Sequence, residues 1–363
     1  MKVIAALSTS DKIGGAELIF KMTCTALGIT NVVVNNVAFN KISIKGSVGM
    51  EFSLINRNVY SIINFLFRYI PTVKLLLKQF HNADVVYVND FRGLFYLFFL
   101  KPFSKARIYY HCHSTFRNTL FNRTIISAFI NHLCAVVIVP SDYLKNDLDF
   151  IGIRKISKVY NGIKRPSFKE KTFIDGIGNN SICRIGIFGA INDQKGQDVF
   201  VSAIEELLTR EFLVEGHIVG YTLDEQYAAD LKRKAGQMSK SIVFHGELPH
   251  IEALELLNEM DIIVCASKYR ETLPTVLLEA MSLQKPVIGT NIGGIPEIIA
   301  PEENGLLVHP ENKIELANSA EKIIKGNLFN TYGLSGFLKF QKEFSLDSYI
   351  NKMKILLDGK EKA

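Results

Sequence analysis

Arg270-Glu-Thr-Leu-Pro-Thr-Val-Leu-Leu-Glu279 is the most informative stretch of this chain. It follows the apolar run Asp261-Ile-Ile-Val-Cys-Ala-Ser267 and precedes Lys285-Pro-Val-Ile-Gly-Thr-Asn-Ile-Gly-Gly-Ile-Pro-Glu297. Pro274 suits the first turn of a helix, because the N–H that it lacks would be unpaired there. This order predicts a buried strand, a loop, a helix that carries Glu279, and a second buried strand.

The same alternation extends along the whole chain. Continuous apolar runs that alternate with helical stretches are typical of parallel sheets covered on both faces, so we expect an α/β protein with doubly wound, Rossmann-like sheets. Ten such runs, rich in Val and Ile, occur at residues 3–7, 32–37, 85–88, 108–111, 135–139, 185–188, 213–219, 242–244, 262–264 and 287–288.

The length of 363 residues favours two domains. Polar residues with Pro166, Gly176 and Gly178 predict a linker within 164–180. We therefore expect an N-terminal acceptor-binding domain at 1–165, a C-terminal donor-binding domain at 166–345, and a closing helix at 346–363. Ligands of open parallel sheets bind outside the carboxyl ends of the strands, so we expect the site in a cleft that the two domains face.

Composition indicates a cytoplasmic protein without a secretion signal or a transmembrane anchor. Residues 1–7 form a short apolar run with one positive charge, and the longest apolar stretch, 93–100, is too short to span a bilayer. The five cysteines are odd in number and lack metal-ligand spacing, which suits buried thiols in a reducing compartment.

Charge is distributed unevenly between the two halves. Residues 1–165 hold 21 Lys and Arg against 8 Asp and Glu, a net charge of +13, whereas residues 166–363 have a net charge of −7. The basic half also holds 23 of the 38 Phe and Tyr residues. This favours peripheral contact with an anionic membrane surface or a lipid diphosphate acceptor. Nucleic acid would suit the same pattern, but no nucleic-acid-binding motif accompanies it.

Glu271 and Glu279 lie on either side of the predicted helix N-terminus. The free N–H groups and positive dipole end of a helix attract phosphate oxygens, while carboxylates accept hydrogen bonds from sugar hydroxyls. A sugar diphosphate fits this arrangement.

The chain resembles the retaining family 4 glycosyltransferases of the GT-B fold. The resemblance rests on the segment from about Asp261 to Pro310, and on Gly14-Gly15-Ala16-Glu17, His113, Tyr160-Asn161-Gly162 and Lys195-Gly196. It implies two Rossmann-like domains, with a C-terminal helix that crosses back to the first.

The resemblance also implies a hexosyltransferase that needs no metal and no cofactor. Its donor would be a nucleotide-diphosphate sugar, with UDP or GDP as the favoured nucleotide. Its acceptor would be a saccharide or lipid-linked saccharide in polysaccharide biosynthesis, such as lipopolysaccharide or capsule. The base, sugar, linkage and oligomeric state are not indicated by the sequence.

The expected catalytic residues are Glu271, Lys195 and His113. The expected donor-binding residues are Gly14, Gly15, Gly189, Lys268, Arg270, Thr272, Leu273, Pro274, Thr275 and Glu279. Family members usually carry an arginine where this chain has Ala190, so we expect Lys268 or Arg270 to supply the missing charge.

Each of these residue types also has an ordinary structural use. The two glutamates are alternatively solvated residues of a helix and a loop, and Lys195 is alternatively a solvated turn residue. The glycines are alternatively part of a tight turn, and His113 is alternatively an ordinary histidine at the end of a strand. Strand alternation places His111 on the same side as His113, so either ring is a candidate. A His-Cys-His metal site is disfavoured because adjacent strand residues face opposite ways. At the level of function, a nucleotide-sugar epimerase and a nucleotide-sugar-binding subunit that has lost catalysis remain alternatives.

Overall fold

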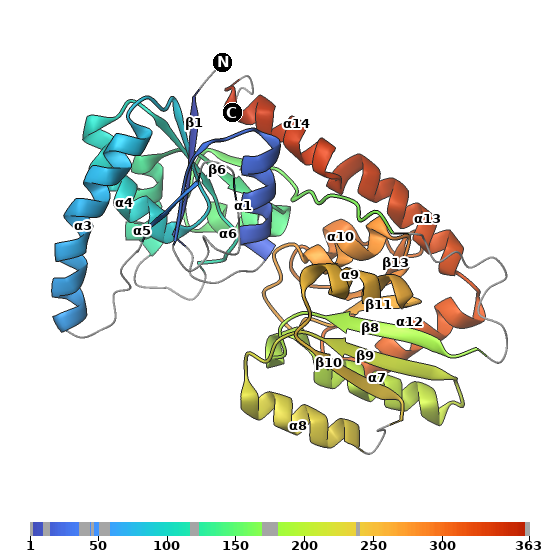
Figure 1. The fold of residues 1–363 in the computed structure, drawn as a ribbon. Coiled ribbons are helices and arrows are strands. Elements are labelled where there is room, and N and C mark those ends of the chain that lie inside the picture. Colours follow the sequence, from blue (N-terminus) through green and yellow to red (C-terminus); the bar gives the residue numbers. More distant parts are fainter. Residues whose placement is uncertain are drawn as a thin grey trace. The chain divides into compact units, whose positions relative to one another are not determined.

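The computed structural model describes residues 3–9, 15–35, 44, 47–50, 59–116, 123–168, 181–236 and 240–359, and for residues 49–50 and 59–69 it describes the backbone alone. The chain divides into two compact units, Met1–Asn161 with Tyr349–Ala363, and Gly162–Ser348. Figure 1 shows the elements of both units. Of the expected linker, residues 169–180 lie outside the described residues.

The first unit is built on a parallel sheet in the order β3-β2-β1-β4-β5-β6-β7. Because β1 has β2 on one side and β4 on the other, the strand order reverses between β1 and β4, as in a doubly wound fold. The strands are β1 (Ile4–Ser8), β2 (Asn31–Asn35), β3 (Ser47–Met50), β4 (Val85–Val88), β5 (Arg107–His111), β6 (Cys134–Val139) and β7 (Ile156–Lys158).

Helices cover the faces of this sheet (Figure 1). Asp90 and Ser141 begin two of them by accepting hydrogen bonds from the backbone N–H three residues on. The described helical segments are α1 (Gly15–Ala26), α3 (Val59–Phe80), α4 (Phe91–Leu100), the 3-10 turn η1 (Lys101–Phe103), α5 (Arg123–Leu133) and α6 (Asp142–Phe150).

The closing helix α14 (Leu346–Leu357) packs into the first unit, which confirms the expected return of the C-terminal helix. Tyr349 on α14 is fully buried, and its hydroxyl lies 2.6 Å from Thr23 Oγ1 on α1. Thr23 donates its own hydroxyl hydrogen to the Ile19 carbonyl, so Tyr349 is the donor in this pair.

The second unit has a parallel sheet in the order β10-β9-β8-β11-β12-β13. Here the strand order reverses between β8 and β11, and the two doubly wound sheets that the sequence predicts are confirmed. The strands are β8 (Cys183–Phe188), β9 (Val214–Val219), β10 (Ile242–Gly246), β11 (Ile262–Cys265), β12 (Val287–Thr290) and β13 (Gly305–Val308).

Apolar side chains of β8, β9 and β11 form the core of this unit with α7 and α12. Phe200 and Ile204 on α7 are almost completely buried. The helical segments are η3 (Asp193–Lys195), α7 (Gln197–Thr209), α8 (Glu225–Ala235), α9 (His250–Glu259), α10 (Thr275–Ser282), α11 (Ile295–Ile298), α12 (Lys313–Lys325), α13 (Phe329–Lys339) and the π-helical turn η5 (Phe340–Phe344).

Among the described residues, three strands were not among the ten predicted runs. They are β3, β7 and β13, each at the edge of its sheet. An edge strand has a neighbour on one side only, so it can be short and polar, as Ile156-Ser157-Lys158 is. All five cysteines are buried free thiols. Within the described part of the chain, no helix combines the length and the apolar character needed to span a bilayer.

The Tyr349 hydroxyl makes a specific contribution to the stability of the first unit. We expect Tyr349→Phe to lower the free energy of unfolding by about 1–2 kcal/mol, because the buried Thr23 oxygen loses its donor. Urea unfolding followed by circular dichroism measures this. Thr23→Val removes the same bond, so the two losses should not add in the double variant. An unchanged unfolding midpoint in Tyr349→Phe would contradict the expectation.

Candidate active site

The expected residues of the second unit gather where its strand order reverses. Gly189 directly follows β8, and Lys195 ends the short η3 turn beyond it. Ser267 and Glu271 follow β11, the strand that pairs with β8. Because the carboxyl ends of neighbouring parallel strands meet at one edge of the sheet, two segments distant in sequence lie together there.

The centre of this site is a partly buried ion pair. Lys195 Nζ lies 2.6 Å from Glu271 Oε2, and Ser267 Oγ donates a hydrogen bond of 2.9 Å to the same carboxylate oxygen. Burial acts to lower the pKa of Lys195, but the Glu271 carboxylate outweighs it and the pKa is raised. Lys195 is therefore a fixed cation, and Glu271 is held by two donors.

The backbone around Glu271 explains the glycine pair at 293–294. Gly294 N–H donates to the Glu271 carbonyl at 2.9 Å. Gly293 has a φ of +58°, and a Cβ there would lie 1.8 Å from that carbonyl oxygen. Only glycine allows this approach, so residues 293–294 fix the loop that carries Glu271.

Helix α10 begins directly after this loop. Pro274 is its N-cap and makes no side-chain cap hydrogen bond, and the first turn holds no acidic residue. The helix therefore starts at Thr275, one residue later than expected. Leu273 is buried, whereas Thr272 and Thr275 are half-buried. The helix N-terminus thus presents backbone N–H groups near the segment that positions Glu271.

Glu279 lies about one turn along α10, and its side chain is 14% exposed. Its Oε1 is 3.0 Å from His250 Nε2, at the start of α9. The hydrogen bond with Glu279 raises the pKa of His250, and this outweighs the opposing effect of burial. The sequence did not single out His250. Its position 29 residues before Glu279 gives no periodic signal that would link the two.

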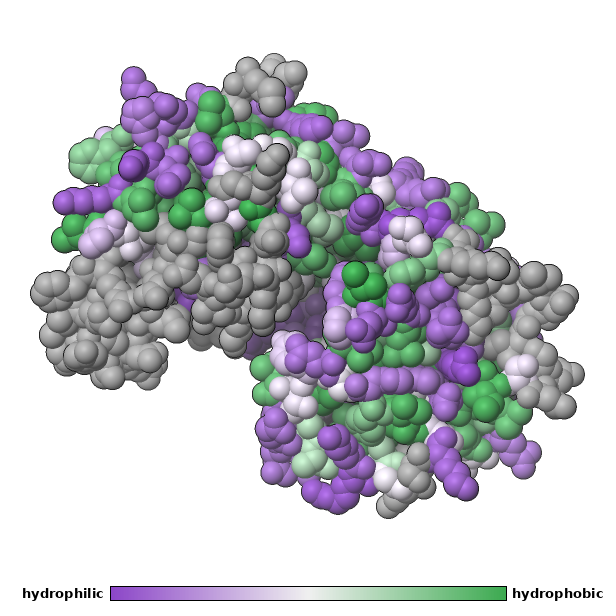
Figure 2. Space-filling model, viewed as in Figure 1, coloured by the Kyte–Doolittle hydropathy of each residue, from purple (hydrophilic) through white to green (hydrophobic). Residues whose placement is uncertain are grey.

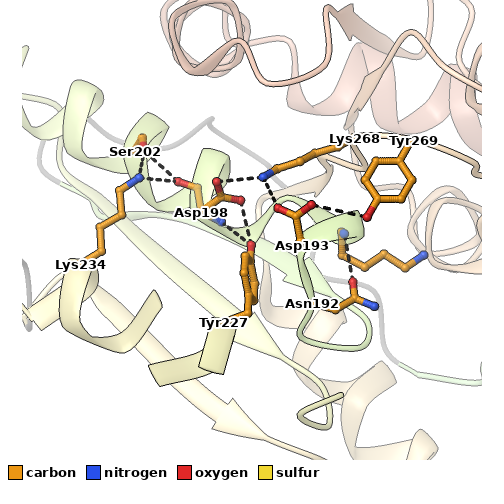
Figure 3. A network of polar contacts seen from close by, with 9 residues as sticks. Asn192, Asp193, Asp198, Ser202, Tyr227, Lys234, Lys268 and Tyr269 are labelled. Atoms are coloured by element: carbon orange, nitrogen blue, oxygen red, sulfur yellow. Dashed lines mark hydrogen bonds and ion pairs between the residues drawn. The ribbon is translucent and has the colours of Figure 1, made fainter. Parts of the chain in front are cut away.

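Lys268 has a different environment from the one expected (Figure 3). Its Nζ lies 2.6 Å from Asp193 Oδ1 and 3.0 Å from Asp198 Oδ2, and its backbone N–H donates to the Gln194 carbonyl. Burial acts to lower the pKa of Lys268, but these hydrogen bonds raise it overall. The ammonium of Lys268 is therefore engaged by two carboxylates and ties η3, with Lys195 at its end, to the loop after β11.

The structure describes three of the remaining residues that we expected to bind the donor, namely Gly189, Arg270 and Gly15. Gly189 has a φ of +143°, which favours glycine, and Ala190 beside it is half-buried. Arg270 is exposed, with its guanidinium carbon 5.9 Å from the centre of the Tyr269 ring. In the first unit, Gly15 is the exposed first residue of α1. Gly14 lies outside the described residues.

His113 lies in the first unit, just beyond the carboxyl end of β5. Its Nε2 is 3.1 Å from Asn89 Oδ1, and its ring centre is 4.1 Å from that of His111, which confirms that both rings share one side. Burial lowers the pKa of His113 to about 4 and that of His111 well below its usual value. Both rings are neutral at physiological pH. Asn89 is a further polar residue here that the sequence did not indicate.

Two family models match the chain in succession. The model described as Glycosyltransferase Family 4 matches residues 35–165, and the model described as Glycosyl transferases group 1 matches residues 182–326. An uncharacterized glycosyltransferase of Methanocaldococcus jannaschii is 28% identical over 217 residues, 58% of this chain. That match spans 52% of the archaeal protein, about half its length.

A protein in the cps region of Klebsiella pneumoniae is 23% identical over 82% of this chain and 85% of that one. Among solved structures, Anabaena HepE in complex with UDP has a TM-score of 0.83 and 21% identity, and the alignment covers 99% of this chain and all of that one. A structural likeness at this identity shows the fold alone.

The ion pair makes a prediction about the ionisation of Lys195. We expect Glu271→Gln to lower the pKa of Lys195, because the desolvating environment remains while the compensating charge is lost. In the native protein, the contribution of this pair to stability is fully present below the ordinary lysine pKa of 10.5 and is lost as the pH rises through the higher folded-state value. An NMR titration of the labelled Lys195 amine measures the shift.

Ser267→Ala is the control for this titration, because it removes a neighbour of Glu271 and leaves the carboxylate in place. Its Lys195 pKa should stay above 10.5. Equal pKa values for Lys195 in the native protein and in Glu271→Gln would show that the carboxylate does not set its ionisation.

Proposed function

This chain belongs to the glycosyltransferases of group 1 and family 4, and we propose that it is a retaining enzyme that moves a sugar from a nucleotide-diphosphate sugar to a saccharide or lipid-linked saccharide. The observation that carries the proposal is the partly buried Lys195–Glu271 pair at the reversal of strand order in the second unit. A fixed cation and a fixed hydrogen-bond acceptor at that edge suit a diphosphate joined to a sugar.

Lys195 is the proposed partner of the donor diphosphate. An ammonium binds phosphate as a point charge, and the N-terminus of α10 adds backbone N–H groups and the positive end of a helix dipole. An ammonium has three N–H donors, so Lys195 would bind a phosphate oxygen while it keeps its contact with Glu271, whose carboxylate would accept a hydrogen bond from a hydroxyl of the transferred sugar. The UDP bound in the Anabaena relative supports a nucleoside diphosphate donor, with UDP or GDP favoured.

Glu279 is the proposed partner of the donor ribose. A carboxylate can accept hydrogen bonds from both ribose hydroxyls at once. Its partial burial on α10 and its contact with His250 hold it in one orientation. His250 would keep its hydrogen bond with Glu279 when the ribose binds, so the ribose would not need to displace His250.

The proposed reaction breaks the bond between the anomeric carbon and the diphosphate oxygen while the acceptor oxygen bonds that carbon on the same face. The acceptor proton passes to an oxygen of the leaving diphosphate. Lys195 stabilises the negative charge that develops on the diphosphate without a metal, and Glu271 stabilises positive charge at the anomeric carbon. Neutral His113 would hold a sugar hydroxyl by hydrogen bonding, because its lowered pKa keeps it uncharged.

The proposed setting is polysaccharide synthesis, such as lipopolysaccharide or capsule, on the cytoplasmic side of a membrane. The relative in the Klebsiella cps region supports this process. The net charge of +13 on residues 1–165 supports peripheral contact with anionic lipid.

The two glutamates should affect different kinetic constants. With the donor identified by thermal-shift screening of UDP, GDP, ADP and their sugars, we expect Glu279→Gln to raise the donor KM roughly tenfold, because one hydrogen-bonded contact is weakened in ground and transition states alike. We expect Glu271→Gln to lower kcat on the order of 100-fold, because it removes charge stabilisation that forms in the transition state.

Steady-state kinetics with varied donor measures both effects. Glu255→Gln, an exposed glutamate on α9, is the matched control and should leave both constants unchanged. Full activity in both Glu279→Gln and Glu271→Gln would rule out the proposed roles.

Ala190 allows the alternative functions to be tested. If the chain is a nucleotide-sugar-binding subunit that has lost catalysis, Ala190→Arg should raise turnover at least about tenfold by adding a guanidinium for the diphosphate. We expect the native chain to be active already, so that the substitution changes kcat by less than that. Incubation with donor alone tests the epimerase alternative, and an isomerised sugar in the absence of acceptor would replace our proposal.

A further inference from the structure

The first unit contains a cavity that the proposed reaction does not use. Its volume is about 430 Å³, which is in the range of small-molecule sites. It lies between α3, α4 and the amino ends of β4 and β5, and η1 and the residues before β5 close it on one side. His113, in contrast, lies beyond the carboxyl end of β5. The cavity and the expected acceptor site are therefore at opposite ends of the strands of one sheet.

The interior of the cavity is apolar. Val86 and Ile108 form its floor, and they are paired neighbours on β4 and β5. Leu97 and Leu100 on α4 and Phe80 on α3 form its walls, and all five side chains are at most 4% exposed. An apolar lining offers water few hydrogen bonds, so a hydrocarbon is the favoured occupant.

The lining also includes polar and cationic residues. They are Lys78 and His81 from the end of α3 and Lys101 and Ser104 from the segment after α4. Lys78 and His81 are exposed, and within the described residues no carboxylate is recorded in an ion pair with Lys78 or Lys101. Two uncompensated ammonium groups beside an apolar cavity are complementary to an anionic group on a hydrocarbon.

One aromatic side chain at the cavity is largely exposed: Phe103, which lines the cavity, is 75% exposed. Phe95 and Phe98 on the neighbouring α4 are also partly exposed, and their rings contact Phe129 on α5. Figure 2 shows hydrophobic residues interleaved with hydrophilic ones on the visible face of the first unit. Aromatic residues beside lysines are typical of surfaces that meet the headgroup region of a lipid layer.

We propose that this cavity is a binding site for a single-chain amphiphile whose hydrocarbon chain fills the interior and whose phosphate or carboxylate head meets Lys78 and Lys101. The site is separate from sugar transfer. Such a ligand would link the first unit to a source of lipid through its basic, aromatic surface.

The experiment uses the absence of tryptophan from the chain. Phe103→Trp places one fluorophore at the cavity, and the full-length protein is titrated with dodecyl phosphate below its micelle concentration. We expect a saturable change in fluorescence. Dodecanoate tests the carboxylate head, dodecyltrimethylammonium tests the same chain with a positive head, and inorganic phosphate tests the head alone.

Binding of either anionic amphiphile, with at least tenfold weaker binding of the cationic one and of phosphate, supports the proposal and identifies the head group. Equal binding of the cationic amphiphile, or of phosphate alone, would overturn it. Phe150→Trp, a similarly exposed position outside the cavity lining, detects non-specific adsorption. An equal response from that reporter would also overturn the proposal.

Charge variants on the reporter background test the named residues. Lys78→Glu with Lys101→Glu should weaken dodecyl phosphate binding at least tenfold, because attraction becomes repulsion. Lys74→Glu with Lys105→Glu is the matched control, since it changes two exposed lysines of the same region that do not line the cavity. If both double variants lose the same amount of dodecyl phosphate affinity, the effect comes from overall charge, and the assignment of Lys78 and Lys101 to the head group is overturned.

Leu77→Trp, made without the Phe103 reporter and followed by calorimetry, tests occupancy of the interior. Leu77 lines the cavity from α3, and the larger side chain should abolish binding by filling it. Unchanged affinity would exclude the cavity as the binding site. If this variant does not fold, as thermal melting would show, the surface lysine pairs decide the question by themselves.

Discussion

A half-buried lysine and a buried glutamate, Lys195 and Glu271, impose the main constraint on the second unit. Their side chains are 28% and 11% exposed, and removing such charges from water is costly unless each has a partner. The attraction between the two charges offsets that cost only when the segments that carry Lys195 and Glu271 are in contact. A pair of this kind is weak evidence for stability. It lies beyond the carboxyl ends of β8 and β11, where open parallel sheets bind their ligands.

Several other features of the unit serve to keep that pair in position. Gly293 allows the backbone to approach the Glu271 carbonyl, and Lys268 joins the loop after β11 to η3 through Asp193. Ser267 adds a second donor to Glu271. These contacts come from three separate segments, and together they limit the motion of both charged groups. Electrostatic stabilisation of a reacting group is effective only when the charges are preorganised in this way.

The first unit differs from the second in what it offers to a ligand. Near the carboxyl ends of its strands, the neutral imidazoles of His111 and His113 and the amide of Asn89 can form hydrogen bonds without carrying charge. Uncharged groups of this kind suit sugar hydroxyls. At the amino ends of the strands, an apolar cavity lies beside Lys78 and Lys101, which form no ion pair with the carboxylates that the structure describes. The uneven charge along the sequence thus corresponds to different chemistry in the two units, and the excess of basic residues lies in the unit with exposed aromatic side chains.

The sequence by itself determined the elements with strong local signals. The apolar runs at Val85–Val88 and Ile262–Cys265, the helical spacing over Leu346–Leu357 and the motif around Glu271 were all readable, because they depend on residues close together in the chain. Only the tertiary structure decided the partners of those residues. Lys195 and Glu271 are 76 positions apart, and Glu279 meets His250 on another helix. Strand order and helix packing bring them together, and neither leaves a periodic pattern in the sequence. The same reason applies to the short edge strands and the cavity, since both arise from how distant segments pack.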